Sequence, residues 1–233
     1  MKIKLLLFLG ILLPLGLHAQ NVSQEETRKS LFGKKNTTET KAEQSGIKKS
    51  NFKGSKDLSN YLVGAVPIED GRVVFTTEIP TKMSKNEMIK VLSEWASKQF
   101  IPEASTPSTE ATDAKVVSVD PVSGKIVCEG DEYLVFTRKF LVLNQARIHY
   151  VLTIQCQDEL CKLTLSKIRY DYNPTPEENT YTRIAAENLI TDQYALRSKG
   201  TKLVRESGTH FRVFTIDLKD ELFSAVKQQL QDK

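Results

Sequence analysis

The chain has 233 residues, of which 27% are charged and 39% apolar, with 11 Gly, 8 Pro and 3 Cys. This composition excludes a collagen-like, a disulfide-dense and a multi-span membrane protein, and the length suffices for one sizeable hydrophobic core. The formal charge of +4 belongs to the N-terminal region, because residues 61–233 carry 22 Lys or Arg against 24 Asp or Glu. A nucleic-acid-binding domain concentrates cations on its folded surface, so nucleic acid is not an expected partner.

The first nineteen residues have the pattern of a secretory signal peptide. Lys2 and Lys4 flank the start of an apolar run at 3–13, and the small residue Ala19 is followed by Gln20. The run is shorter than the roughly 20 residues that a membrane-spanning helix needs, so we predict cleavage after about Ala19 rather than an uncleaved anchor. The mature protein is then expected in the periplasm, at the cell surface or outside the cell, without a transmembrane segment.

Residues 20–60 are predicted to be a disordered polar tether. They carry nine Lys or Arg and five Asp or Glu, and branched aliphatic residues are rare. Such a segment cannot bury enough apolar surface to offset the entropy lost on ordering. A basic arm that touches anionic lipid or polysaccharide is the alternative, and the interspersed acidic residues favour the solvated tether.

Residues 61–233 are predicted to form a single domain that begins with a strand at about 73–79. Ser84 and Glu87 then have the spacing of a capping box, which predicts a helix beginning at Ser84. Its apolar residues repeat at helical spacing and are expected in the core: Met88, Ile89, Leu92, Trp95, Ala96 and Phe100. Residues 101–113 contain Pro, Ser and Thr and are predicted to form a loop.

Four strands are expected next, at about 114–120, 125–137, 146–156 and 161–172. No helix separates them, which predicts antiparallel meander connections. Residues 173–233 follow the last of these strands and are treated as a C-terminal extension of the domain.

The extension is predicted to be helical. A helix starts at about 175–178 with Tyr181, Ile184, Ala185 and Leu189 on its apolar side. A final helix runs from about Asp217, as its cap, to Leu230. The order of strand, helix, four strands and helices predicts the α+β class, with helices on one face of an antiparallel sheet.

Four segments carry a family resemblance: VPIEDGRVVF at 66–75, EWA at 94–96, GDEYLVF at 130–136 and IRY at 168–170. They resemble the exported domain-of-unknown-function family numbered 4468. The resemblance covers about residues 65–172 and implies a TATA-binding-protein-like (TBP-like) fold, a strand-helix-four-strands unit. The later segments at 190–196 and 215–223 look like what usually follows that domain. No catalytic or ligand-binding residue is established for the family, so the resemblance implies a fold and an envelope location but no chemistry.

Cys156 and Cys161 flank residues 157–160. If those residues form a hairpin loop, Cys156 lies opposite Cys161, and in an oxidising compartment we predict a disulfide that adds about 2 kcal/mol. A zinc site made of the two cysteines with Cys128 and His149 is the alternative. His149 lies an odd number of residues before Cys156, so on a regular strand the two face opposite ways, which disfavours zinc. Cys128 is expected to be a buried thiol.

The same register sorts the side chains of the two strands. The face expected under the helices carries Ile148, Tyr150, Leu152, Ile154, Leu163 and Leu165 together with the two cysteines. The opposite, open face carries Arg147, His149, Val151, Thr153, Gln155, Lys162, Thr164, Ser166, Ile168 and Tyr170. Lys167 and Arg169 fall on the nominal core face, which predicts a bulge or an uncovered strand end before Tyr170.

Three residues of the open face are candidates for binding: Arg147, His149 and Tyr170. With the neighbouring hydroxyl side chains they could recognise an anionic or sugar-like ligand or a partner surface. A solvated sheet face is the alternative, because Thr and Ser also favour strands.

Motifs of known reactions are missing. The sequence has no nucleophile elbow, phosphate-binding loop, dinucleotide fingerprint, zinc-protease helix or calcium loop, and no cofactor is predicted. Adjacent carboxylates such as Asp131 and Glu132 point to opposite faces of a strand and make no catalytic pair. We therefore expect a non-enzymatic binding or interaction module of the cell envelope, with an envelope protein or a glycan as partner. The alternatives are a small hydrolase that uses His149 or His210, and a structural component that self-associates through a sheet edge.

Overall fold

The computed structural model describes residues 58–105, 110–139, 142–172 and 181–231. All of them belong to one compact unit, Gln44–Lys233. The predicted signal peptide at 1–19 and nearly all of the predicted tether at 20–60 lie outside the described residues. Within the described ranges, no helix combines the length and the apolar character needed to cross a membrane.

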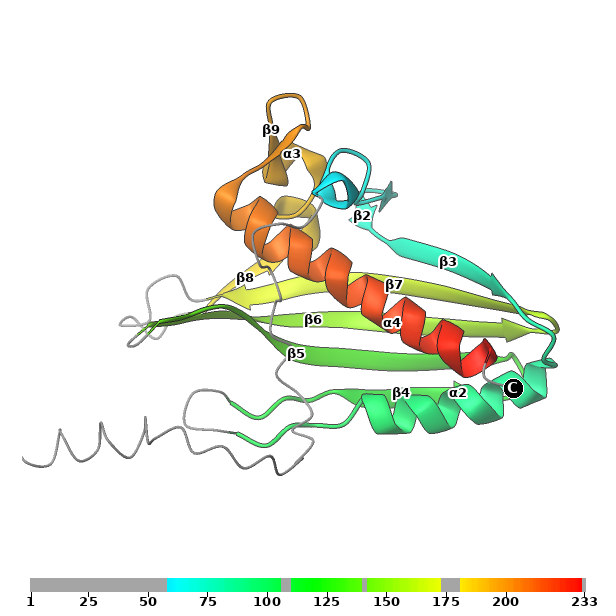
Figure 1. The fold of residues 1–233 in the computed structure, drawn as a ribbon. Helices are drawn as coiled ribbons and strands as arrows, with labels where there is room; N and C mark the ends of the chain where they lie inside the picture. The colour runs from blue at the N-terminus through cyan, green and yellow to red at the C-terminus, as the bar shows by residue number, and fades with distance from the viewer. Residues whose placement is uncertain (1–57, 106–109, 140–141, 173–180, 232–233) are drawn as a thin grey trace, which may run out of the picture. The chain divides into compact units, whose positions relative to one another are not determined.

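A six-stranded antiparallel sheet forms the centre of the unit (Figure 1). Its strands are β3 (Phe75–Pro80), β4 (Lys115–Asp120), β5 (Lys125–Lys139), β6 (Val142–Gln157), β7 (Leu160–Tyr172) and β8 (Thr182–Ala185). The strand order is β3-β7-β6-β5-β4, which confirms the predicted meander of β4 to β7. Strand β8 pairs with the end of β7, and β3 pairs with its first half, so β3 and β8 lie along the same edge of β7.

Two helices lie on one face of the sheet (Figure 1). Helix α2 (Lys85–Gln99) packs on β4, β5 and β6, and α4 (Val213–Gln231) contacts α2 and β3. The predicted capping box is present, because the Ser84 side chain accepts the Glu87 N–H and the Glu87 carboxylate accepts the Ser84 N–H. Trp95 is partly buried, with its ring edge-to-face at 6.1 Å from that of Phe100.

Short elements complete the unit. They are η1 (Ser59–Tyr61), β1 (Ile68–Glu69), β2 (Arg72–Val73), η3 (Ala186–Asn188), α3 (Asp192–Ala195), β9 (Leu196–Arg197), β10 (Lys202–Leu203) and the π-helical η4 (Arg205–Arg212). The strands β1 and β2 form one hairpin and β9 and β10 another. Segment η4 continues directly into α4.

The predicted register of β6 and β7 is confirmed at the hairpin. Cys156 lies opposite Cys161, and only Asp158 and Glu159 form the loop. The core face predicted from this register is buried throughout: Ile148, Tyr150, Leu152, Ile154, Cys156, Cys161, Leu163 and Leu165. The predicted disulfide is not formed in this structure. Cys128, Cys156 and Cys161 are free and buried.

A bulge in β7 changes the faces of the residues that follow it. Lys167 has a φ of 54°, and the register of β6 and β7 shifts by one residue between His149 and Val151. The predicted bulge before Tyr170 is therefore present. Because one extra residue reverses the alternation, Ile168 and Tyr170 lie on the core face, and their predicted place on the open face is wrong.

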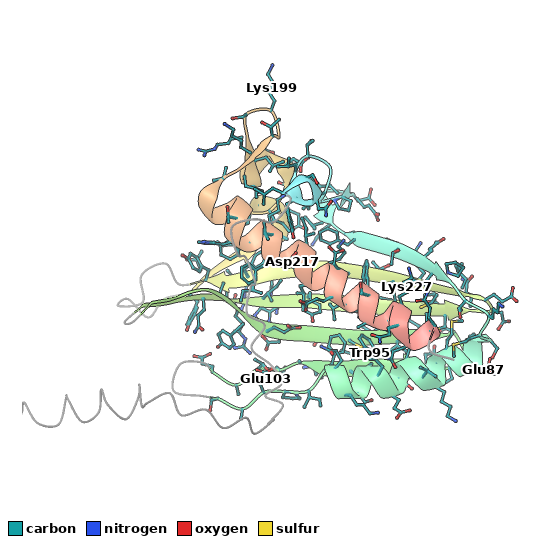
Figure 2. The ribbon with its side chains drawn as sticks, in the orientation of Figure 1. Glu87, Trp95, Glu103, Lys199, Asp217 and Lys227 are labelled. Carbon is teal, nitrogen blue, oxygen red and sulfur yellow. The ribbon has the colours of Figure 1, made fainter. Side chains whose placement is uncertain are left out.

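Two expectations for the extension are also wrong. The first is the helix predicted to start at about 175–178, because residues 182–185 within it form β8 and pair with β7; residues 173–180 lie outside the described residues. The last helix begins at Val213, so Asp217 is not its cap but lies inside α4 (Figure 2). There it accepts a hydrogen bond of 2.6 Å from the Tyr61 hydroxyl.

Candidate functional site

Two rows of side chains cross the open face, which is the sheet face opposite α2 and α4. In the first, Tyr133 of β5 lies opposite Arg147 of β6, which lies opposite Asp171 of β7, which lies opposite Arg183 of β8. We call Tyr133, Arg147, Asp171 and Arg183 the arginine row.

The second row lies beside the first. Asp131 of β5 pairs with His149 of β6, His149 with Arg169 of β7, and Arg169 with Ala185 of β8. We call these four residues the histidine row. Because successive positions on one face of a strand are two residues apart, the rows are direct neighbours on the open face.

The Asp131 carboxylate joins the two rows on the β5 side. It accepts hydrogen bonds from the Arg147 guanidinium, with Nε–Oδ1 at 2.6 Å and a second bond from Nη2 to Oδ2. The backbone N–H of Asp113 adds a bond of 2.6 Å. Burial raises the pKa of Asp131, but the bonds from Arg147 and Asp113 outweigh it and lower the pKa overall, so the carboxyl stays ionised.

His149 lies between two carboxylates. Its Nε2 is 3.0 Å from Oδ2 of Asp171, and its Nδ1 is 3.4 Å from Oδ1 of Asp131. Burial lowers the pKa of His149, and the nearby Asp131 carboxylate only partly opposes this. At neutral pH the ring is therefore uncharged and can donate a proton to only one of the two carboxylates.

Asp171 and Arg183 form the ion pair at the β8 end of the arginine row. The guanidinium Nε and Nη2 lie 2.9 and 3.3 Å from the two carboxylate oxygens. The bond from Arg183 is the largest cause that lowers the pKa of Asp171, and the contact with His149 adds to it. Asp171 is 17% exposed and Arg183 is 69% exposed, so this pair reaches solvent through the arginine.

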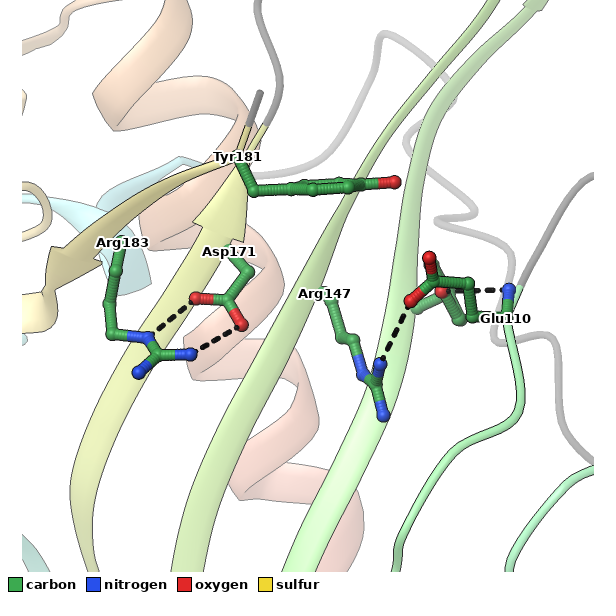
Figure 3. Close-up of a pocket in the computed structure, with 6 residues that line it drawn as sticks. Glu110, Arg147, Asp171, Tyr181 and Arg183 are labelled. Atoms are coloured by element: carbon green, nitrogen blue, oxygen red, sulfur yellow. Dashed lines mark hydrogen bonds and ion pairs between the residues drawn. The ribbon is translucent and has the colours of Figure 1, made fainter. Parts of the chain in front are cut away.

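A pocket of about 290 Å³ opens over the arginine row (Figure 3). Its lining residues are Glu110, Tyr133, Arg147, Asp171, Tyr181 and Arg183. Figure 3 shows the Tyr181 ring extending from the start of β8 across the pocket, with Arg183 on one side and Glu110 on the other. Glu110 is held by a carboxylate contact of 3.6 Å to Arg147 and by its backbone N–H, which donates to the Tyr133 hydroxyl at 3.1 Å.

The pocket residues offer charged groups, hydroxyl groups and an aromatic ring for polar contacts. The described residues that line the pocket include no Ser, Thr or Cys that could act as a nucleophile. In the described part of the chain, no group of three or more His, Cys, Asp or Glu side chains is placed to hold a metal ion. Two exposed charges of opposite sign and an exposed aromatic ring remain available to a ligand.

The predicted site residues are separated by the sheet. Arg147 lies in the pocket, and His149 lies in the neighbouring row, in contact with the pocket residue Asp171. Tyr170 lies on the other side of the sheet, fully buried, with its hydroxyl 2.6 Å from that of Thr215 and its ring 5.0 Å from that of Phe211. The prediction that Tyr170 is a binding residue of the open face is therefore wrong, because the bulge at Lys167 turns its side chain to the core face.

Sequence reasoning missed five of the six pocket residues: Glu110, Tyr133, Asp171, Tyr181 and Arg183. Asp131 and Tyr133 could have been found from the alternation of β5, since both occupy the face that Arg147 shares. Arg183 and Tyr181 could not, because their segment was expected to be helical and only its pairing with β7 brings them to the sheet.

Comparisons with known proteins agree with this architecture. Residues 75–171 match the family described as a domain of unknown function (DUF4468) with TBP-like fold. The chain is similar to the crystal structure of a DUF4468 family protein from Bacteroides ovatus ATCC 8483, at 33% identity and a TM-score of 0.65, over 76% of this chain and 96% of that one.

A second solved structure shares the fold. It is a TBP-like protein from Parabacteroides distasonis ATCC 8503, 20% identical with a TM-score of 0.56, covering 71% of this chain and 97% of that one. No curated protein matches the sequence.

Proposed function

We propose that this protein, which belongs to the DUF4468 family with its TBP-like fold, is an exported, non-enzymatic binding module of the cell envelope. Its ligand would occupy the pocket above the arginine row. The N-terminal sequence supports export, and the site chemistry supports binding rather than turnover. The expected partner is an envelope protein or a glycan that presents polar groups to this face.

The observation that carries the proposal is the prearranged floor of the pocket. The arginine row comes from four neighbouring strands, and ion pairs hold Arg147 to Asp131 and Arg183 to Asp171. Polar groups held on a rigid sheet lose little conformational entropy when a ligand binds, which is what a binding site requires. The exposed Tyr181, 53% accessible, adds an apolar surface beside them.

The contacts of the histidines support a binding role over the hydrolase alternative. Both ring nitrogens of His149 face carboxylates, so the ring acts as a link between the two rows. A general base needs a nitrogen within reach of the proton that it removes. His210 lies in η4, which packs against α3 and α4 rather than on the open face.

The test is affinity capture of envelope extract from the native organism on the immobilised full chain. We expect one component to be retained by the natural protein and lost with Tyr181→Ala. The matched control is Tyr194→Ala, which removes another exposed tyrosine, 46% accessible, from α3. The proposal fails if the same components are retained by the natural protein and by the Tyr181 variant.

A further inference from the structure

The charges that the pocket offers to a ligand are one acid and one base at opposite ends. Glu110 is 71% exposed and Arg183 is 69% exposed, whereas Arg147 and Asp171 are 19% and 17% exposed. Figure 3 places Glu110 and Arg183 on opposite sides of the pocket. The accessible charge of the site is therefore dipolar.

The inner charges of the floor are already compensated. The Asp131 carboxylate accepts hydrogen bonds from Nε and Nη2 of Arg147. The Asp171 carboxylate accepts hydrogen bonds from Nε and Nη2 of Arg183. Among the described residues, Nη1 of Arg183 has no hydrogen-bond partner, and the Glu110 carboxylate contacts Arg147 at 3.6 Å. A carboxylate can still approach Arg183, and an ammonium can still approach Glu110.

The spacing of the strands fixes the length of ligand that reaches both ends. Arg147 and Arg183 lie on β6 and β8, which are two strand spacings of about 4.8 Å apart, so the span is roughly 10 Å. The Glu110 carboxylate lies 3.6 Å from Nη1 of Arg147, so the position of Arg147 marks that end of the span. An extended chain advances about 3.3–3.6 Å per residue, so roughly three residues cover this span.

From these observations we infer that the pocket binds a short zwitterionic peptide of about three residues, with its ammonium at Glu110 and its terminal carboxylate at Arg183. The peptide would lie along the arginine row beside the Tyr181 ring. This inference rests on the proposed function, because it names the ligand class of the same pocket. A neutral sugar carries no charge opposite to that of Glu110 or Arg183, so it would form no charge-assisted hydrogen bond between oppositely charged groups at either end, which disfavours it.

The test is calorimetric titration of the full chain with trialanine, N-acetyl-trialanine and trialanine amide at up to millimolar concentrations. We expect trialanine to bind, and blocking either terminus to weaken binding about fivefold, the effect of losing one exposed ion pair. Glu110→Gln should weaken trialanine to the same extent and leave N-acetyl-trialanine unchanged. Arg183→Gln should weaken the binding of trialanine to the same extent and leave the binding of trialanine amide unchanged. This pairing of a blocked terminus with one variant assigns each end of the ligand to its residue.

Matched controls are Glu69→Gln on β1 and Arg197→Gln on β9, which remove exposed charges away from the pocket. Equal affinity for free and blocked peptides would overturn the inference, as would absence of peptide binding. If a glycan or protein from the extract is nevertheless lost with Tyr181→Ala, the binding function stands and only the ligand class is wrong. If the affinity capture also shows no component that is lost with Tyr181→Ala, both the binding function and the peptide ligand are wrong.

Discussion

At the scale of the residue, the strand alternation of β5 gives neighbouring carboxylates different partners. Asp131 points to the open face and binds Arg147, whereas Glu132 points to the helix side and accepts a hydrogen bond from the buried Tyr150 hydroxyl. Opposite the same tyrosine, Gly130 leaves room for the ring, because a Cβ there would lie 2.0 Å from Cζ of Tyr150. The Asp131 and Glu132 carboxylates therefore both have hydrogen-bond partners within the fold, on opposite faces of the sheet.

His149 makes the stability of the protein sensitive to mild acid. Its folded pKa lies below the ordinary value of 6.5, chiefly because it is buried, although Asp131 and Asp171 oppose the shift and Arg169 adds to it. Between the folded and the unfolded pKa, the unfolded chain binds more protons, so stability is lost as the pH falls below about 6.5. The depressed pKa values of Asp131 and Asp171 add a loss at lower pH, as the pH falls below their ordinary value of 3.8.

We predict that His149→Asn flattens this dependence, because asparagine does not titrate and can still donate a hydrogen bond to one carboxylate. The measurement is urea unfolding at several values between about pH 5 and pH 8. The natural protein should lose free energy of unfolding on acidification in this window, by at most about 1.4 kcal/mol per pH unit from this group. Equal slopes for both proteins would show that His149 is not responsible.

At the scale of the element, the β7 bulge determines which side chains enter the core. Lys167 is the extra residue, exposed and with positive φ, and it allows Ile168 and Tyr170 to follow Leu165 onto the buried face. The same shift puts Arg169 and Asp171 on the open face, where they complete the two rows. A local irregularity in one strand therefore creates a buried aromatic contact and also supplies one residue to each of the two rows.

At Lys167, glycine should give a more stable protein than valine, which is the reverse of the order expected at a regular strand position. With φ at 54°, Lys167→Gly should match or exceed the natural protein, whereas Lys167→Val should lower the free energy of unfolding by about 1–2 kcal/mol. At Lys162, an exposed position in the regular part of β7, valine should be the better residue and glycine should cost about 0.5–1 kcal/mol. Thermal or urea unfolding of the four variants checks this; the same order at both positions would contradict the role of the bulge.

At the scale of the whole molecule, Arg212 connects segments that are far apart in the sequence. Its buried guanidinium donates to the carbonyl oxygens of Tyr61, Leu62 and Ile190 at 2.5–2.7 Å and to the Asp192 carboxylate at 2.7 Å. These bonds join the N-terminal turn η1 and the start of α3 to the junction of η4 and α4. The segments before and after the family match are thereby attached to one another.

We predict that Arg212→Met lowers the free energy of unfolding by about 3–5 kcal/mol, because it leaves two buried carbonyl groups, one partly buried carbonyl group and Asp192 without this partner. Arg197→Met, at an exposed position of β9, is the matched control and should change stability by no more than about 0.5 kcal/mol. Urea unfolding followed by circular dichroism measures both. A loss below about 1 kcal/mol for Arg212→Met would contradict the role assigned to the arginine.

The amino-acid sequence by itself determined the features that depend on near neighbours. The capping box of Ser84 and Glu87, the meander of β4 to β7 and the facing of Cys156 and Cys161 were predicted correctly, because each follows from spacings of a few residues. The opposite orientation of Asp131 and Glu132 follows from the same short-range alternation.

The tertiary structure alone decided the strand at 182–185, the face on which Tyr170 lies and the composition of the pocket. Residues 182–185 became a strand because they pair with the end of β7, and Tyr170 became a core residue because the bulge at Lys167 reversed its face. The pocket draws Tyr133, Arg147, Asp171 and Arg183 from four strands, and no local spacing encodes the register between them. Strand pairing joins residues whose separation in sequence is arbitrary, so the site arises only when the whole sheet has formed.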